Sequence, residues 1–217
     1  SVSILHGLGT PDIRAAVRQA HDVAVREALA VFESAASRGR RGHGGADVID
    51  GDGFVAAAFA HRTSRAGDPH LHTHVVIANL VHGPDGRWTA LDARPLYHWS
   101  KTVGYLYEAE LRHQLTRTVG VEWRTVRRGI ADVAEVPMQV VDEFSTRRHE
   151  IEAHLAENGF DSARSAQLAA YATRRMKDHT ATPESLVDTW QRRASELGFD
   201  CEQVCDRLNA GTLTLRW

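Results

Sequence analysis

The chain has little cysteine: only Cys201 and Cys205 occur in 217 residues, and no metal-binding motif accompanies them. This scarcity excludes the disulfide framework of small secreted domains, so we expect a cytoplasmic protein whose two cysteines are structural. No apolar run approaches the roughly 20 residues that are needed to cross a bilayer. The sequence also opens without the charged and apolar regions of a signal peptide, so we expect no membrane insertion.

A large net charge is missing as well, because 26 basic and 28 acidic residues give a balance of −2. With 42% hydrophobic and 25% charged residues, the composition is that of a globular protein with one sizeable domain or two small ones. The charge is unevenly distributed. Residues 61–128 hold ten basic and six acidic side chains, whereas residues 129–217 hold ten and fifteen. The positive excess favours the middle of the chain as the part that faces a phosphate backbone.

Histidine, in contrast, is abundant, and four of the 13 histidines, His61, His70, His72 and His74, stand in one short stretch. His61 follows an apolar run over residues 54–60, and His72 and His74 precede a second apolar run over residues 75–81. A Gly-Asp-Pro turn lies between the runs, and this pattern is typical of a hairpin of buried strands. Residues two apart on a strand project from the same face, so the three imidazoles can converge on one point.

Three imidazoles are a common ligand set for a divalent transition metal, and three protein ligands leave positions open for water or substrate. We therefore interpret His61, His72 and His74 as the ligands of a working metal site. A lone His-x-His on a strand is weak evidence, and chance clustering among 13 histidines is the competing interpretation. His70 is two residues before His72, so on a strand it projects from the same face as the ligands. Whether it joins the site as a fourth ligand stays open.

The histidine stretch resembles the signature of conjugative relaxases of the MobF class, the TrwC and TraI kind. The residues that carry this likeness are His61, Arg65, Asp68-Pro69, Leu71, His72-Thr73-His74 and Asn79. The likeness extends over nearly the whole chain. Ser1-Val2-Ser3 resembles the end of the family's Pro-Lys-Ser-Val-Ser element, residues 86–91 resemble its next strand, and residues 105–111 resemble its following helix.

The resemblance implies an HUH-type DNA strand transferase, in which a divalent metal ion holds the scissile phosphate and a tyrosine attacks it. It implies metal-dependent, site- and strand-specific nicking and transfer of single-stranded plasmid DNA at a transfer origin, through a phosphotyrosine intermediate. Other conjugation proteins would be further partners. Magnesium or manganese would be the working ion where phosphate and water supply oxygen ligands, while zinc, nickel or copper suit imidazole nitrogen.

The nucleophile is the part of this chemistry that the sequence does not supply. No tyrosine lies within residues 1–96, and core packing explains the four later tyrosines: Tyr97, Tyr105, Tyr107 and Tyr171. In the family, the attacking tyrosines and a metal-supporting aspartate precede the Ser-Val-Ser element. We therefore expect a fragment of a longer protein, which binds metal and DNA but does not nick DNA by itself.

Basic and polar residues near the histidines, and in a second predicted hairpin, are the candidate DNA contacts. The six candidates are Arg62, Thr63, Arg65, Arg124, Arg127 and Arg128. The first three flank a predicted metal ligand, and the arginines of the second hairpin are suited to phosphate contacts. Arg65 is equally suited to an ion pair with Asp68 across the turn.

The remaining pattern predicts an α+β fold, in which helices flank the antiparallel HUH-type palm sheet that the resemblance implies. The expected helices cover residues 11–37, 95–119, 138–158, 162–178, 183–197 and 201–208. The expected strands cover residues 46–49, 54–60, 75–81, 87–92, 121–126 and 130–136, with 87–92 extending the histidine hairpin into a meander. We expect a strand end or short turn over residues 1–8 and a mobile loop over residues 38–45.

Two domains follow from this order. Residues 1–136 form a mixed palm core with the metal site, and residues 137–217 form a helical extension that covers the DNA cleft. Two other functions fit the same residues. One is another three-histidine metallohydrolase, which would need a carboxylate general base near the metal. The other is a non-catalytic DNA-binding module with structural histidines.

Overall fold

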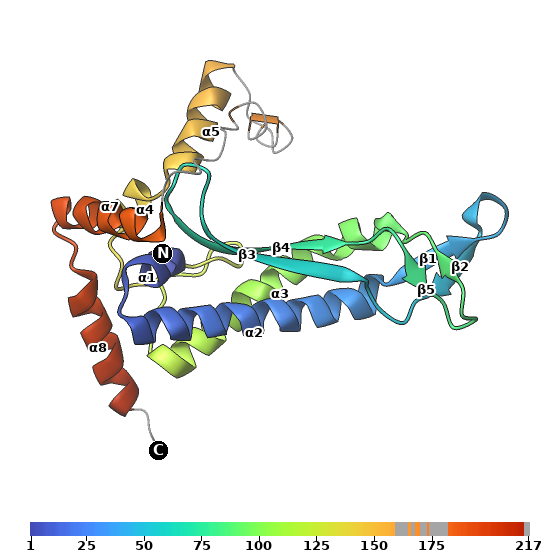
Figure 1. Ribbon diagram of the computed structural model, residues 1–217, viewed down its shortest axis with the longest axis horizontal. Helices are drawn as coiled ribbons and strands as arrows, with labels where there is room; N and C mark the ends of the chain where they lie inside the picture. The colour runs from blue at the N-terminus through green and yellow to red at the C-terminus, as the bar shows by residue number, and fades with distance from the viewer. Residues whose placement is uncertain (159–164, 166–167, 170–172, 174–181, 215–217) are drawn as a thin grey trace.

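The computed structural model describes residues 1–158, 165, 168–169, 173 and 182–214. Two long helices, α2 (Pro11–Ala36) and α3 (Ala93–Val119), pack against each other along the molecule, and the β3–β4 hairpin runs beside them (Figure 1). An arm of short strands lies at one end, and the C-terminal helices lie at the other. The predicted α+β class is confirmed, and all strand pairs within the described residues are antiparallel.

The long helices form where capping residues and apolar spacing predict them. Helix α2 has Thr10 at the N-cap and Pro11 at the first helical position, although the Thr10 hydroxyl makes no capping bond. Helix α3 ends at Gly120, whose φ of 76° lies in the left-handed region. Helix α7 (Pro183–Glu196) begins with a capping box between Thr182 and Ser185, and α8 (Cys201–Thr214) follows.

Two stretches of helix differ from their predictions. Residues 1–8 were predicted as a strand end or short turn, but Val2–Leu8 is helix α1, in which Ile4, Leu5 and Leu8 are buried. So short a segment shows too few residues to separate a helical stripe from a strand. The predicted helix 138–158 is two helices, α4 (Met138–Glu143) and α5 (Thr146–Glu157), which part at Phe144 and Ser145. The predicted helix 162–178 lies largely outside the described residues.

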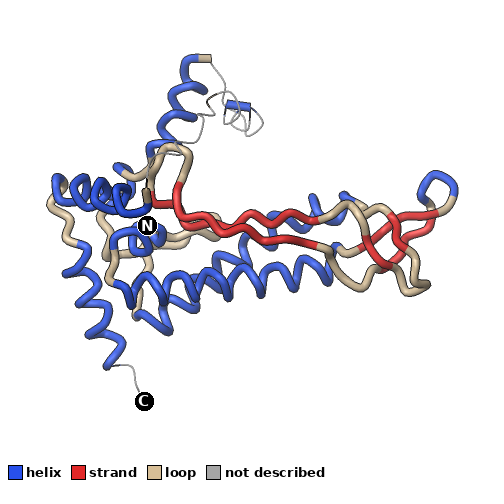
Figure 2. The backbone as a smooth tube through the Cα atoms, in the orientation of Figure 1, coloured by secondary structure: helices blue, strands red, loops and turns tan. Residues whose placement is uncertain are grey.

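The strands form three separate pairs (Figure 2), so the predicted meander was wrong. The histidine hairpin consists of β3 (Ala56–Thr63) and β4 (Pro69–Ile77) alone. Strand β5 (Val81–His82) pairs with β6 (Trp88–Thr89) away from it. The alternation of apolar and polar residues along a strand indicates which face is buried but does not identify the strand with which it pairs.

The arm also corrects the loop predicted over residues 38–45. Strand β1 (Arg38–Arg41) and the 3-10 turn η1 (His43–Gly45) occupy that stretch, and β1 pairs with β2 (Asp47–Asp50). Gly39 is needed there because a Cβ atom would come within 2.9 Å of Val81 Cγ1. The glycine therefore allows a close approach and does not confer mobility. In the other predicted hairpin, residues 121–136, only the isolated bridges Trp123–Val133 and Arg127–Ile130 form.

One core joins helices α1, α2, α3, α4, α7 and α8. Its buried members come from these helices and from the 121–140 segment, and they include Leu5, Val17, Leu115, Val121, Val133, Val136, Val140, Trp190 and Cys205. Residues from both sides of position 136 share this cluster. The division into a palm core and a helical extension stays a prediction.

The turn of the histidine hairpin is fixed by a buried carboxylate. Asp68 is 2% exposed and accepts hydrogen bonds from the backbone N–H and the hydroxyl of Thr146, at 3.0 and 3.1 Å. Arg193 of α7 donates to Asp68 at 3.0 Å and to the Glu143 carboxylate at 2.7 Å. The Trp190 indole N–H also donates to the Gly67 carbonyl at 2.8 Å. The turn is therefore attached to α5 and α7 by directional bonds.

We expect Asp68→Asn to lower the free energy of unfolding by about 2–4 kcal/mol, because Arg193 and the α5 N-terminus lose a buried negative partner. The control is the same substitution at Asp142, whose side chain is 75% exposed beside His149 and whose loss costs less than about 1 kcal/mol. Urea unfolding of the two variants and the wild type measures the difference. Equal stabilities for both variants would contradict the anchoring role of Asp68.

Candidate metal centre

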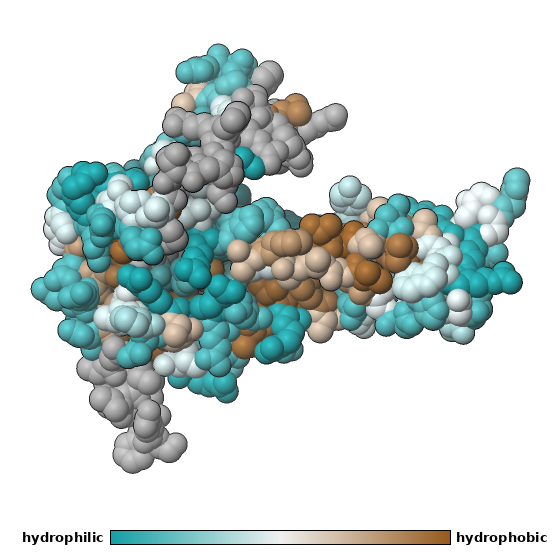
Figure 3. All heavy atoms as spheres, viewed as in Figure 1, coloured by the Kyte–Doolittle hydropathy of each residue, from teal (hydrophilic) through white to brown (hydrophobic). Residues whose placement is uncertain are grey.

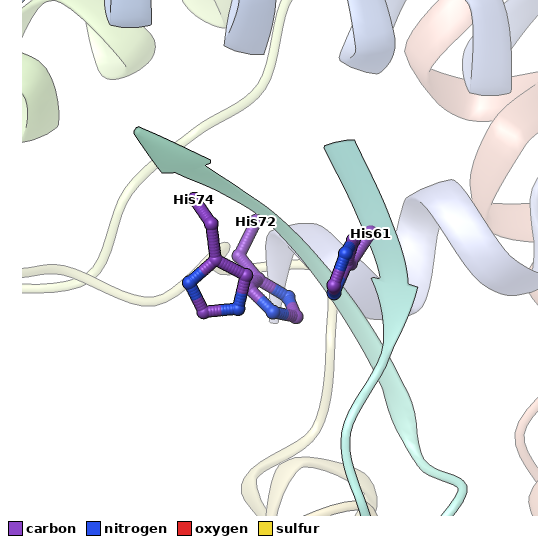
Figure 4. Close-up of side chains that lie close together, drawn as sticks. All are labelled: His61, His72 and His74. Carbon is purple, nitrogen blue, oxygen red and sulfur yellow. The ribbon is translucent and has the colours of Figure 1, made fainter. Parts of the chain in front are cut away.

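The register of β3 and β4 brings the three histidines together. His61 stands directly opposite His72, and His74 stands opposite Phe59, two residues before His61 on β3. Side chains of directly paired residues lie on the same face of a sheet, and His74 shares the face of His72. The hairpin thus presents all three rings on one side, as Figure 4 shows.

The three rings are close enough to share one ion. Their nearest nitrogen atoms all lie within 4.8 Å of one another, and the ring centroids are 4.9–5.2 Å apart. Nitrogen–metal bonds of about 2.0–2.1 Å place bound nitrogens roughly 3 Å apart, a spacing that small side-chain rotations reach. Among the described residues, no other group of three histidine, cysteine or acidic side chains comes together in this way.

A backbone contact sets the orientation of the His72 ring. His72 Nδ1 lies 2.9 Å from the His70 carbonyl oxygen, which can only accept a hydrogen bond. Nδ1 therefore carries the proton, and Nε2 is left to offer a lone pair to a metal ion. Such a second contact fixes the tautomer and the direction of a ligating imidazole.

His70 lies against this group without belonging to it. Its ring stacks on that of His72 with a centroid distance of 4.4 Å, while the close set consists of His61, His72 and His74. Burial lowers the pKa of His70, and the neighbouring His72 lowers it further. Both effects favour an uncharged ring beside the ligands.

The ligand face is open to solvent. His61 and His74 are exposed, and His72 is half-buried. Farther along the same face, Phe59 and Val76 are 53% and 60% exposed, and apolar side chains gather over this part of the molecule in Figure 3. An ion bound here would therefore face an accessible surface with room for a large substrate.

The predicted DNA contacts near the first ligand point in different directions. Arg62 lies at the register shift between His61 and Thr63, and its charge is close enough to His6 of α1 to lower the pKa of that ring. Thr63 pairs with Pro69 across a register shift, and Arg65 is an exposed residue of the turn. Asp68 forms an ion pair with Arg193. The roles of Arg62, Thr63 and Arg65 in binding DNA stay predictions.

The arginines of the 121–136 segment also differ from one another. Arg124 donates to the carbonyls of Ala134 and Val136 at 3.0 and 3.2 Å, which ties its side chain to its own hairpin. Arg127 and Arg128 are exposed at the tip, where Arg128 has a φ of 52°. The tip arginines are thus better placed for a phosphate than Arg124, although all three contacts stay predictions.

The described tyrosines all lie on α3. Tyr107 is half-buried and shares a 2.8 Å hydrogen bond with His21, as expected for a packing residue. Tyr97 and Tyr105 are 82% and 40% exposed, so core packing does not explain them as predicted. Tyr171 lies outside the described residues.

His6 is a half-buried titratable group that the sequence did not single out. Burial, together with the positive charges of Arg62, Arg18 and Arg14, lowers the pKa of His6 to about 4. A histidine in the unfolded chain takes up a proton near pH 6.5. The folded state thus binds fewer protons than the unfolded state between these two values, so stability is lost as the pH falls through that window.

We expect His6→Gln to remove this part of the pH dependence. The free energy of unfolding of the variant, relative to the wild type, should rise as the pH is lowered from about 6.5 to about 4 and level off below. Urea unfolding at a series of pH values measures both proteins under the same conditions. A difference that stays constant across the window would show that His6 titrates normally in the folded chain.

No helix in the described ranges combines the length and the apolar character that a membrane crossing requires.

Sequence comparisons match the chain to a relaxase family and to a conjugation protein of Escherichia coli. The family model described as TrwC relaxase matches residues 1–197. The multifunctional conjugation protein TraI of Escherichia coli is 34% identical over 196 residues, which are 86% of this chain and 11% of TraI. TraI of Escherichia coli strain K12 is 31% identical over 208 residues, or 90% of this chain and 11% of TraI. The chain therefore spans about a tenth of the length of these curated relatives.

Solved structures of TrwC agree with the sequence match. The metal-free complex of conjugative relaxase TrwC with oriT DNA has a TM-score of 0.83 at 33% identity, covering 93% of this chain and 71% of that one. The metal-bound complex has a TM-score of 0.82 at 33% identity, covering 93% and 70%. These values confirm the relaxase-like α+β fold. Since the family model spans residues 1–197 and the relatives agree in sequence and fold, the chain belongs to the TrwC relaxase family.

Proposed function

We propose that the chain is the metal-binding part of a conjugative relaxase, which nicks and transfers one strand of plasmid DNA at a transfer origin. The main observation behind this proposal is the convergence of His61, His72 and His74, whose nitrogens lie within 4.8 Å of one another on an open face. Family membership supports it, as do the TrwC complexes with oriT DNA and the description of TraI as a conjugation protein.

His61, His72 and His74 would hold one divalent ion. When bound, the ion neutralises charge on the non-bridging oxygens of a phosphodiester, which lowers the barrier to in-line attack. Three uncharged ligands leave the positive charge of the ion nearly intact, which suits an anionic substrate. The His70 carbonyl orients His72 by accepting a hydrogen bond from its Nδ1–H group, so the ring needs no reorientation when the phosphate arrives.

Magnesium or manganese is our proposal for the working ion. Both accept phosphate and water oxygens in the positions that the three imidazoles leave free. Zinc, nickel and copper are alternative occupants because they bind imidazole more tightly. One TrwC complex with oriT DNA is described as copper-bound, and it is 34% identical to this chain with a TM-score of 0.81.

The DNA would lie across the exposed ligand face, with its phosphates held by basic side chains. Arg127 and Arg128 at the exposed tip, and Arg65 in the hairpin turn, are the proposed contacts with the best access. Arg62, Thr63 and Arg124 are proposed contacts that would first have to turn from their present neighbours. Residues 137–217 would form the helical extension over the DNA, beside the palm core of residues 1–136.

The attacking tyrosine is proposed to lie outside these 217 residues. Tyr107 shares its hydroxyl with His21, so using it as a nucleophile would break a half-buried contact. Tyr97 and Tyr105 belong to the long helix α3, away from the histidine strands in sequence. Strand transfer through a phosphotyrosine is therefore proposed for the complete protein, which we place in the cytoplasm with other conjugation proteins.

We expect the chain to bind a labelled single-stranded oligonucleotide about tenfold more tightly in buffer with Mn²⁺ than in buffer with EDTA. This difference corresponds to roughly 1.4 kcal/mol of binding free energy for one metal–phosphate contact. His72→Ala should abolish this increment. His113→Ala, a control at an exposed position of α3, should retain it. Fluorescence anisotropy measures the affinities of all three proteins in Mn²⁺ and in EDTA, at one fixed salt concentration because phosphate contacts depend on salt.

The other outcomes separate the competing functions. Equal affinity in Mn²⁺ and EDTA would favour a non-catalytic DNA-binding module with structural histidines. Cleaved DNA that is not attached to protein would favour a metallohydrolase. A covalent protein–DNA adduct, seen as a shifted band in a denaturing gel, would place the nucleophile within these residues and overturn that part of the proposal.

A further inference from the structure

The strand that carries two of the three ligands is held to the body by few apolar contacts. Strand β3 is exposed along seven of its eight residues, and in β4 only Pro69 and Leu71 are buried. A cavity of about 420 Å³, lined in part by His72, Thr73 and Tyr107, borders β4 on the side of the helices. Strands with little buried surface specify their register weakly. Apolar packing therefore fixes β4 at Pro69 and Leu71, and the part of the strand beyond them depends on polar contacts.

A chain of hydrogen-bonding side chains reaches β4 at the residue between His72 and His74. His21 of α2 is 3% exposed, and its Nε2 atom lies 2.8 Å from the Thr73 hydroxyl. Its Nδ1 atom lies 2.8 Å from the Tyr107 hydroxyl of α3, and the two rings meet edge to face at 5.7 Å. Both ring nitrogens are used, so His21 links the ligand strand to both long helices.

Thr73 projects from the face of β4 opposite to the ligands, because side chains alternate along a strand. A bond at this position therefore fixes the backbone between His72 and His74 without touching the ion. A slide of β4 by two residues would bring Val75, which has no hydroxyl, to His21. The same slide would move both ligands by about 7 Å along the strand. The Thr73–His21 bond can form in one register only.

We propose that His21 is a positioning residue of the metal centre, which acts through Thr73 to hold His72 and His74 opposite His61. This inference rests on the proposed function in so far as the three histidines bind a divalent ion. Burial lowers the pKa of His21 and raises the pKa of Tyr107, which favours an uncharged ring and a protonated phenol. An uncharged ring donates through one nitrogen and accepts through the other, so each hydroxyl has a defined role.

The test uses Co²⁺ as the probe, because its visible absorption reports both affinity and ligand geometry. Thr73→Val keeps the β-branched shape and removes the hydroxyl, so we expect Co²⁺ affinity to fall by about 10- to 100-fold, with an altered spectrum. Thr73→Ser restores a hydroxyl and should bind within about threefold of the wild type. Tyr107→Phe, which leaves one His21 nitrogen without its partner, should give a smaller loss.

The matched control is Thr118→Val, because the exposed Thr118 hydroxyl donates to the Gln114 carbonyl within α3. It should leave Co²⁺ affinity and spectrum unchanged. A merely structural role for His21 predicts that Thr73→Val lowers the melting temperature but binds Co²⁺ like the wild type at low temperature, which would overturn the inference alone. A wild-type chain that binds no Co²⁺ would overturn the proposed function and the inference with it.

Discussion

The pairing of His61 with His72 across two antiparallel strands is the constraint on which the candidate metal centre depends. It places a ligand from each strand on one face, and the period of two residues then adds His74. A shift of one residue would turn the β4 ligands to the other face. The chemistry thus depends on register more than on the presence of histidines.

Register is maintained from two places that lie far from the hairpin in sequence. Asp68 attaches the turn to α5 and α7, and the hydroxyl of Thr73 reaches His21 between the long helices. Both contacts are buried or half-buried and directional, whereas β3 itself contributes little to the core. The hairpin therefore behaves as an exposed platform whose position is set by polar bonds to a well-packed helical body.

The sequence was sufficient for features with a local cause. Pro11 and Gly120 mark helix ends, and two apolar runs with a Gly-Asp-Pro turn between them predict the histidine hairpin. The prediction that its strands are buried was wrong, because β3 is exposed along seven of its eight residues and β4 buries only Pro69 and Leu71. The sequence was insufficient where the role of a residue depends on a contact with a residue far away in the chain. In the sequence, Gly39 is typical of a flexible loop, and only the structure shows that it allows Val81 to approach closely. The contact of Asp68 with Arg193 spans 125 positions, and the contact of Thr73 with His21 spans 52 positions. No local pattern signals bonds of that separation.

The Asp68–Arg193 pair also has a consequence for biosynthesis. The hairpin emerges from the ribosome more than a hundred residues before its guanidinium partner, which follows 125 positions later. Until α7 is made, the carboxylate at the turn lacks this cation and has the Thr146 donors of α5 as its partners. Closing so long a loop is entropically costly and slow. The nascent chain therefore completes its ligand platform late, after most of the described helices have been synthesised.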